Sequence, residues 1–197
     1  MRILFFALIF TIKNINKIAV HLAEGFEEIE AVSIIDVLRR AEINVIVVSI
    51  SDIMQVTGSH GIKIIADRLF NSVDYELIDM IILPGGMPGS AHLNEHLGLR
   101  EQILNFNENN KLLGAICAAP LVFGNLKILK NKNATCYPGF ENQLHGAIVT
   151  HENLEVADNI ITAKGAGVAI DFALKIVEIL KGKILAEKLA EKMIAIR

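Results

Sequence analysis

The chain has 197 residues, 52% of them hydrophobic and 21% charged, and a net charge of −3. This balance excludes a disordered chain, and without Trp or a run of basic residues a nucleic-acid-binding surface is not expected either. Two cysteines are too few for a disulfide scaffold in a chain of this length, so we expect a reducing, cytoplasmic compartment and no specific membrane partner.

Residues 1–16 are an apolar extension that needs its own interpretation. Met1 and Arg2 precede an apolar run over 3–12, which imitates a secretory signal but is too short to span a bilayer. No small-x-small cleavage site follows it. A weak signal peptide, an interfacial membrane anchor and an over-long start all remain open, and we favour the last because the fold begins cleanly at Lys17. We expect a single domain over 17–197.

From Lys17 onward, short β-branched or apolar runs alternate with segments whose apolar residues recur every three to four positions. The expected strands are 18–22, 44–50, 62–65, 79–83, 112–116, 147–150, 154–156 and 159–162, with 55–67 forming a hairpin-like insert at the sheet edge. The expected helices are 27–41, 99–109, 120–129, one opening after 164–167, and 184–196. This alternation predicts an α/β sandwich with a largely parallel central sheet.

The stretch 111–120 (KLLGAICAAP) predicts a buried strand, an abrupt turn that carries Cys117, and the start of a helix. Small residues on both sides of Cys117 suit a tight turn that exposes a side chain at its apex, as in nucleophile-elbow enzymes. Backbone N–H groups at a helix start would favour the thiolate. Cys117 is therefore a candidate nucleophile, and the alternative is that it serves as a small buried hydrophobic residue.

Two other segments are expected to meet Cys117, because the ends of parallel strands lie along one edge of the sheet. The Gly85–Gly86 turn follows a strand, and Glu30 lies in the first turn of the first helix. The N–H groups of Gly86 and Ala118 would form an oxyanion hole.

A carboxylate beside a thiolate is a like-charge pair, so one partner must hold a proton. We expect a protonated Glu30 that donates to the Cys117 thiolate, with the pKa of the acid raised and that of the thiol lowered.

Five motifs stand in unbroken order between Lys17 and the C-terminus. They are EGFEEIE (24–30), DVLRR (36–40), LPGG (83–86), AICA (115–118) and GAG (165–167). At this spacing they resemble the ThiJ/PfpI superfamily, in the branch of the Parkinson-disease-associated deglycase and its bacterial homologue YajL.

The resemblance implies a flavodoxin-like fold, a homodimer, and neither a metal nor an organic cofactor. It implies that Cys117 is the nucleophile and an oxidation-sensitive thiol, that Glu30 hydrogen-bonds it, and that Gly86 and Ala118 supply the oxyanion N–H groups. Gly85 and Tyr137 are expected at the pocket.

The chain departs from the histidine-assisted members of this superfamily. Protease-like members carry a histidine directly after the nucleophile, where this chain has Ala118, and amidotransferases carry a late His-x-Glu, where His151 and Glu152 are adjacent. Some relatives have a histidine where this chain has Tyr137, so no general base of near-neutral pKa is assured beside the thiol. The histidines show no metal-ligand spacing beyond His92-x3-His96, which we interpret as a solvated pair.

Two functions are compatible with these residues. The first is a cofactor-free glyoxalase or protein deglycase, which acts on methylglyoxal or its early thiol and amine adducts in carbonyl and oxidative stress defence. The alternative is a non-enzymatic redox sensor or chaperone whose cysteine is oxidised.

Overall fold

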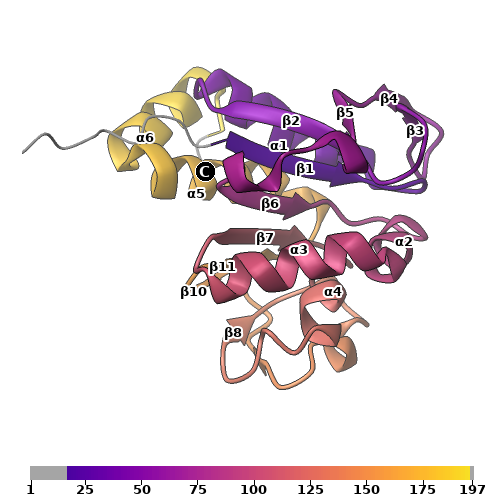
Figure 1. The fold of residues 1–197 in the computed structure, drawn as a ribbon. Helices are drawn as coiled ribbons and strands as arrows, with labels where there is room; N and C mark the ends of the chain where they lie inside the picture. The colour runs from indigo at the N-terminus through magenta and orange to yellow at the C-terminus, as the bar shows by residue number, and fades with distance from the viewer. Residues whose placement is uncertain (1–16, 196–197) are drawn as a thin grey trace, which may run out of the picture.

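A seven-stranded sheet forms the middle layer of the computed structural model, which describes residues 17–195 (Figure 1). The strand order is β10-β11-β7-β6-β1-β2-β5, and among the described residues only the β10–β11 pair of this sheet is antiparallel. Its strands are β1 (Lys17–Leu22), β2 (Asn44–Ser49), β5 (Arg68–Leu69), β6 (Met80–Leu83), β7 (Leu112–Ile116), β10 (Leu154–Ala157) and β11 (Ile160–Ala163).

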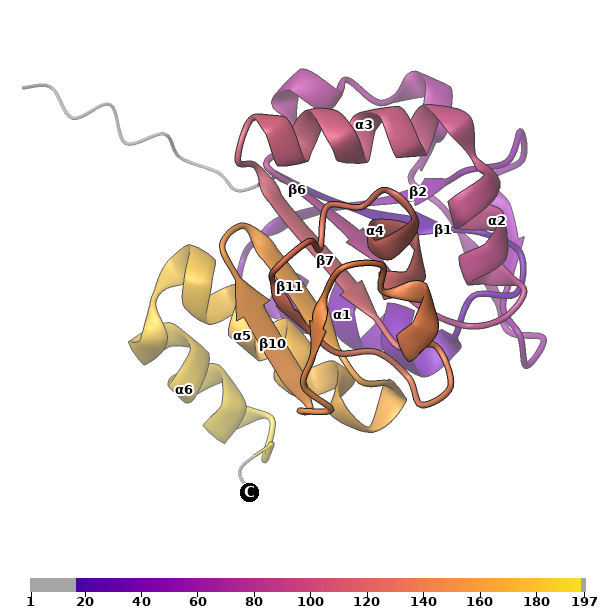
Figure 2. The ribbon, with the colours of Figure 1, turned by 90° about the horizontal axis from the view of Figure 1, so that it is seen from below.

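Helices cover both faces of this sheet, as Figure 2 shows. One face carries α1 (Glu28–Arg40) and α5 (Ala169–Lys181), with α6 (Lys183–Lys192) packed on α5. The other face carries α2 (Gly89–Glu95), α3 (Leu97–Glu108) and α4 (Pro120–Asn125). Short 3₁₀ turns complete the connections: η1 (Phe70–Ser72), η2 (Tyr75–Leu77), η3 (Glu141–Gln143) and η4 (Ala166–Val168). The predicted three-layer α/β sandwich with a largely parallel sheet is confirmed.

Burial explains the apolar composition of the central strands. Every residue of β6, and every residue of β7 after Leu112, is buried, because helices cover both sheet faces. The apolar stripe of α1 packs into the same core as α5, and Ile34 and Leu38 of that stripe are fully buried. The carboxyl ends of β1, β6 and β7 consequently lie side by side in a rigid frame.

Two small sheets lie apart from the central one. β3 (Gln55–Thr57) and β4 (Lys63–Ile65) form the predicted hairpin, but they pair with each other and β5 is the edge strand of the main sheet. β8 (Asn133–Ala134) and β9 (Ile148–Val149) form a parallel pair. Within residues 17–195, no helix is long and apolar enough to cross a membrane.

Three helices depart most from the prediction. Helix α2 was not expected, because Pro88 and Gly89 predicted a turn, yet Pro is well tolerated where a helix begins. Helix α4 ends at Asn125 and does not continue to 129, since the chain turns at Lys127 with a left-handed φ of 60°. Helix α6 covers 183–192 and not 184–196. The interpretation of residues 1–16 lies outside the described residues.

Candidate active site

Cys117 lies in the sharp turn directly after β7. Its φ is +64°, a left-handed conformation that is uncommon for a residue with a side chain and that recurs at functional turns. Its N–H donates to the carbonyl of Ala163 at 2.9 Å, and its carbonyl accepts from the N–H of Tyr137 at 2.7 Å. These two bonds hold the turn, and Cys117 as a residue is partly exposed. The structure thus places Cys117 at the apex that the sequence predicted.

Glu30 lies beside this turn, in the first turn of α1. Glu27 precedes the helix, and its side chain accepts the N–H of Glu30 at 2.7 Å, which is an N-cap interaction. The side chain of Glu30 is fully buried, and its Oε2 accepts the N–H of Gly85 at 2.7 Å. Among the described residues its Oε1 has no hydrogen-bond partner. Oε1 is therefore the oxygen that is free to take or give a proton.

The side chains of Glu30 and Cys117 lie so close to position 85 that only glycine fits there. A Cβ atom on Gly85 would lie 2.5 Å from Cβ of Cys117 and 2.8 Å from Oε2 of Glu30. No side chain fits there, so glycine lets the β6 turn approach both groups. Gly85 is buried at this contact, and its expected place at the pocket stays a prediction.

The environment of Glu30 favours its neutral form. Burial is the main cause and raises the pKa of the carboxyl to about 7, against the opposing hydrogen bond from Gly85 and the interaction with Cys117. The charge of Glu27 raises this pKa further. The predicted upward shift of the acid is thus seen, and it makes Glu30 a group of near-neutral pKa next to the thiol.

The pKa of the Cys117 thiol differs from the prediction. Burial first, and then the charge of Glu30, raise the pKa of Cys117 to about 12. The N–H groups of Gly86 and Ala118 oppose this shift without overcoming it. The expected lowering of the pKa of Cys117 is therefore wrong when the neighbouring Glu30 is ionised. The physical reason is that the small, buried turn desolvates the sulfur more strongly than two N–H dipoles stabilise its charge.

The N–H groups of Gly86 and Ala118 both act on the sulfur of Cys117. Gly86 has a φ of +91°, and a Cβ there would lie 2.4 Å from the main-chain N of Glu27. Only glycine permits both the left-handed turn and this close approach. The turn after β6, the turn after β7 and the start of α1 therefore converge as predicted.

Tyr137 lies next to the Cys117 turn, to which its N–H is hydrogen-bonded. Its ring is half-exposed and lines an open, apolar cavity of about 340 Å³. The remaining walls come from the adjacent proline and from two short segments near β10 and β11. The lining residues are Tyr137, Pro138, Asn153, Lys164, Gly165, Ala166, Gly167 and Val168.

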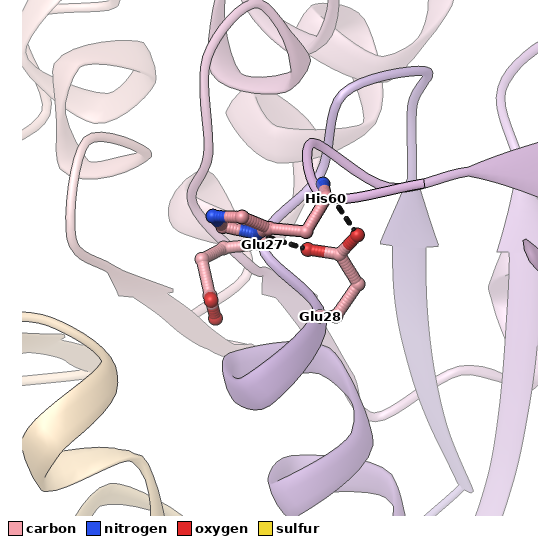
Figure 3. A group of neighbouring side chains, drawn as sticks. All are labelled: Glu27, Glu28 and His60. Atoms are coloured by element: carbon pink, nitrogen blue, oxygen red, sulfur yellow. Dashed lines mark hydrogen bonds and ion pairs between the residues drawn. The ribbon is translucent and has the colours of Figure 1, made fainter. Parts of the chain in front are cut away.

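Metal-binding geometry was not predicted, but Glu27, Glu28 and His60 offer ligand atoms within 4.8 Å of one another (Figure 3). Glu28 is buried, and its oxygens already accept the N–H groups of His60 and Ile62 and an ion pair from the His60 ring at 2.8 Å. We interpret these hydrogen bonds and this ion pair as the contacts that hold the β3–β4 turn against α1.

His92 and His96, the pair with metal-ligand spacing in the sequence, have two different structural roles. Nδ1 of His92 lies 3.0 Å from the carbonyl of Glu24, whereas Nδ1 of His96 accepts the N–H of Leu99 at the start of α3. Each ring is therefore held by its own main-chain contact.

A flavodoxin-like sandwich with a cysteine in a strained turn, a buried acid beside it and two N–H groups directed at the sulfur defines the class of protein. The profile of the DJ-1/PfpI family matches residues 16–179. The chain belongs to the DJ-1/PfpI family, which confirms the resemblance drawn from its motifs.

Individual relatives agree with this assignment. Protein DJ-1 homolog B of Arabidopsis thaliana is 38% identical over 170 residues, which are 85% of this chain and 39% of that protein. The chain thus spans less than half the length of that relative. The glutathione-independent glyoxalase DJR-1.2 of Caenorhabditis elegans is 35% identical over 161 residues, 81% of this chain and 85% of the relative. Oxidized DJ-1 of Toxoplasma gondii superposes with a TM-score of 0.87 at 38% identity, covering 90% of this chain and 97% of the other.

Proposed function

We propose that the chain is a cofactor-free, cysteine-dependent glyoxalase that converts methylglyoxal to lactate and removes its early adducts from thiols and amines. One observation carries the proposal: Glu30, a buried acid with a pKa of about 7, lies next to the thiol of Cys117, and residues 17–195 offer no hydrogen-bond partner to its Oε1. A general base works best when its pKa is near the working pH. Glu30 therefore supplies the base that was left in question because this chain has Tyr137 where some relatives have a histidine.

The first step joins the thiol to the aldehyde. Ionised Glu30 takes the proton of Cys117 as the sulfur attacks the aldehyde carbon, so the high pKa of the resting thiol is no obstacle. The C–S bond forms, the carbonyl π bond breaks, and the oxygen accepts hydrogen bonds from Gly86 and Ala118. Glu30 then gives this proton to the oxygen, which yields a hemithioacetal and leaves Glu30 ionised for the next step.

The second step moves hydrogen within the adduct. Glu30 removes the proton from the former aldehyde carbon, and a proton is returned to the neighbouring carbon through an enediol. This isomerisation gives a lactoyl thioester on Cys117 without an external oxidant or reductant. Water then cleaves the thioester and releases lactate and the thiol, so that one methylglyoxal and one water give one lactic acid.

Two further observations support the proposal. The C. elegans relative named as a glutathione-independent glyoxalase is matched over 85% of its length. The described residues place His151 with its ring exposed and no histidine within the group formed by Cys117, Glu30 and the two glycines. The site thus resembles neither a protease nor an amidotransferase that relies on histidine.

The experiment is a lactate assay that resolves the two enantiomers, on methylglyoxal and on its hemithioacetal with a small thiol. We expect one lactate enantiomer from the wild type, none above background from Cys117→Ser, and a strong reduction for Glu30→Gln. The absence of lactate from the folded wild type would reject the enzyme. The two free cysteines are consistent with the reducing, cytoplasmic setting that we propose for this activity.

One observation favours a second function, that of a redox sensor or chaperone. The similar T. gondii protein has been solved in an oxidized form, and Cys117 is a partly exposed residue. The raised thiol pKa makes direct oxidation slow, since the thiolate is the form that peroxide attacks. Peroxide oxidation of Cys117 without any lactate formation would favour this function.

We also propose that two copies of the chain associate through α1 and β4. Ile29 and Val32 on α1 and Ile65 on β4 are exposed by 60%, 48% and 65%, and Val32 and Ile65 line the same surface hollow. Adjacent exposed apolar residues are typical of an interface between subunits. Sedimentation of the wild type and of Val32→Glu tests the dimer.

A further inference from the structure

We propose that the apolar cavity beside Tyr137 receives the substituent of the 2-oxoaldehyde, and that the enzyme therefore prefers 2-oxoaldehydes with a bulky apolar group, such as phenylglyoxal, over methylglyoxal. This inference rests on the proposed function and specifies its substrate class.

The cavity adjoins the nucleophile through the main chain. Cys117 does not line it, but one wall begins at Tyr137, whose N–H donates to the carbonyl of Cys117 at 2.7 Å. The other wall begins at Lys164, directly after Ala163, whose carbonyl accepts the N–H of Cys117 at 2.9 Å. Both walls are thus one hydrogen bond from the turn that carries the sulfur.

The side chain of Cys117 faces the same side of the sheet as the cavity. It packs against the core cluster that contains Val168, and Val168 lines the cavity. Cys136, which precedes Tyr137 in the chain, belongs instead to the core cluster on the opposite face of the sheet. In this proposal, a substituent attached to a carbon bound to Cys117 extends toward the Tyr137 side of the site.

The chemistry of the walls selects apolar groups. The ring of Tyr137 lies against Gly165, where a Cβ would be 3.3 Å from the ring. Lys164 contributes its stem, because its ammonium group donates to the carbonyl of His151 at 3.0 Å. The ammonium is therefore already engaged outside the cavity and does not present a charge to the ligand.

The size of the cavity fits a substituent larger than methyl. Its volume of about 340 Å³ is at the small end of ligand pockets and corresponds to about ten water molecules. A methyl group would leave most of this apolar surface wet. A phenyl ring would cover it, and each buried methylene-sized unit gives about a four-fold gain in binding.

Gly167 provides a variant that fills the cavity without disturbing the fold. It lines the cavity, and a Cβ on it would meet nothing within 4 Å. Ala190→Leu is the matched control, since it adds apolar volume to a separate hollow between α5 and α6. Thermal unfolding of both variants shows whether they remain folded.

The test is the ratio of kcat/KM for phenylglyoxal, which gives mandelate, to that for methylglyoxal. We expect at least about a ten-fold preference for phenylglyoxal in the wild type and in Ala190→Leu. In Gly167→Leu the ratio should fall to about one. Turnover of both aldehydes with a ratio that Gly167→Leu leaves unchanged would overturn the cavity inference and leave the glyoxalase intact.

A binding measurement tests the cavity separately from the proposed glyoxalase activity. If neither aldehyde is turned over, the glyoxalase is rejected, and acetophenone, which cannot react as an aldehyde, serves as the probe. Methyl NMR shifts at Ala166 and Val168 that saturate in the wild type and are lost in Gly167→Leu would support the cavity as an aryl site. No shifts at these methyls would overturn it.

Discussion

The main-chain N–H of Gly85 donates to Oε2 of Glu30 at 2.7 Å, and this bond fixes a buried acid beside the thiol of Cys117. Because the bond uses only one carboxyl oxygen, Oε1 remains for proton exchange with the sulfur. The bond also stabilises the ionised acid, while burial opposes it more strongly and leaves the pKa near 7. The reactivity of the site follows from this balance.

The first prediction concerns the pH dependence of activity. In the proposed mechanism the carboxylate of Glu30 is the base. Because its pKa is about 7, kcat/KM for methylglyoxal should fall about ten-fold per pH unit below 7 and level off above it. Glu30→Gln should lose this dependence and be slower by roughly 10²- to 10⁴-fold. A wild-type profile that is flat between pH 5 and pH 8 would contradict the role of Glu30.

A second prediction concerns stability at the same residue. The pKa of Glu30 is about 7 in the folded chain, above its ordinary 4.5, so the folded state binds the proton more tightly. This contribution to the free energy of unfolding is complete below pH 4.5 and is lost as the pH rises through 7. Urea unfolding at pH 5 and pH 8 should show a smaller pH effect in Glu30→Gln than in the wild type.

Gly85→Ala should damage both stability and activity. Its new Cβ would overlap Cys117 and Glu30, and overpacking of this kind costs about 1–3 kcal/mol. The same displacement should reduce kcat more than it raises KM for methylglyoxal, because it separates the base from the nucleophile. Chemical denaturation and steady-state kinetics check the two effects, and full activity in Gly85→Ala would show that the close approach is unnecessary.

Glu28 should stabilise the turn between β3 and β4. Burial works to raise its pKa, but hydrogen bonds from His60 and Ile62 outweigh it and lower the pKa to about 2. The stabilisation is therefore present above pH 4.5 and is lost as the pH falls toward 2. Glu28→Ala leaves two main-chain N–H groups without their acceptor and should cost about 2 kcal/mol or more at pH 7.

His60→Ala is the matched comparison for Glu28. It removes only an exposed ring and keeps the carboxylate that accepts the main-chain N–H groups. It should lower the unfolding midpoint less than Glu28→Ala does. Equal losses in the two variants would mean that the ion pair, and not the main-chain bonds, holds the turn.

Tyr75→Phe should destabilise the chain without altering the active site. Nε2 of buried His21 lies 2.8 Å from the hydroxyl of Tyr75, and burial lowers the pKa of His21 to about 3. Loss of the hydroxyl would leave a buried ring nitrogen without a partner, which costs about 1–3 kcal/mol. Urea unfolding measures this cost, and an unchanged midpoint would show that water replaces the hydroxyl.

The sequence predicts well where periodicity and turn chemistry are strong. The strand at 112–116 has its predicted bounds, and the first helix differs from its prediction by one residue at each end. The meeting of Glu30, Gly86 and Cys117 follows from the rule that parallel strands end at one edge, so the placement of these residues was predictable.

The rest depends on long-range packing. The thiol pKa is set by burial of the turn, which no local pattern reveals. His21 and Tyr75 are 54 positions apart, and no motif joins them. The cavity is formed by segments around 137 and 164–168, which are far apart in the sequence and are held near the Cys117 turn by the main-chain hydrogen bonds of Tyr137 and Ala163.

Mass spectrometry of single turnovers tests the central claim most directly. Wild-type protein mixed with a limiting amount of methylglyoxal and quenched at intervals should carry one methylglyoxal mass on the peptide of Cys117. This adduct should decay at the rate at which lactate appears. In Glu30→Gln the adduct should persist with little lactate. Lactate that forms without an adduct on Cys117, or that forms equally fast in Cys117→Ser, would contradict the account.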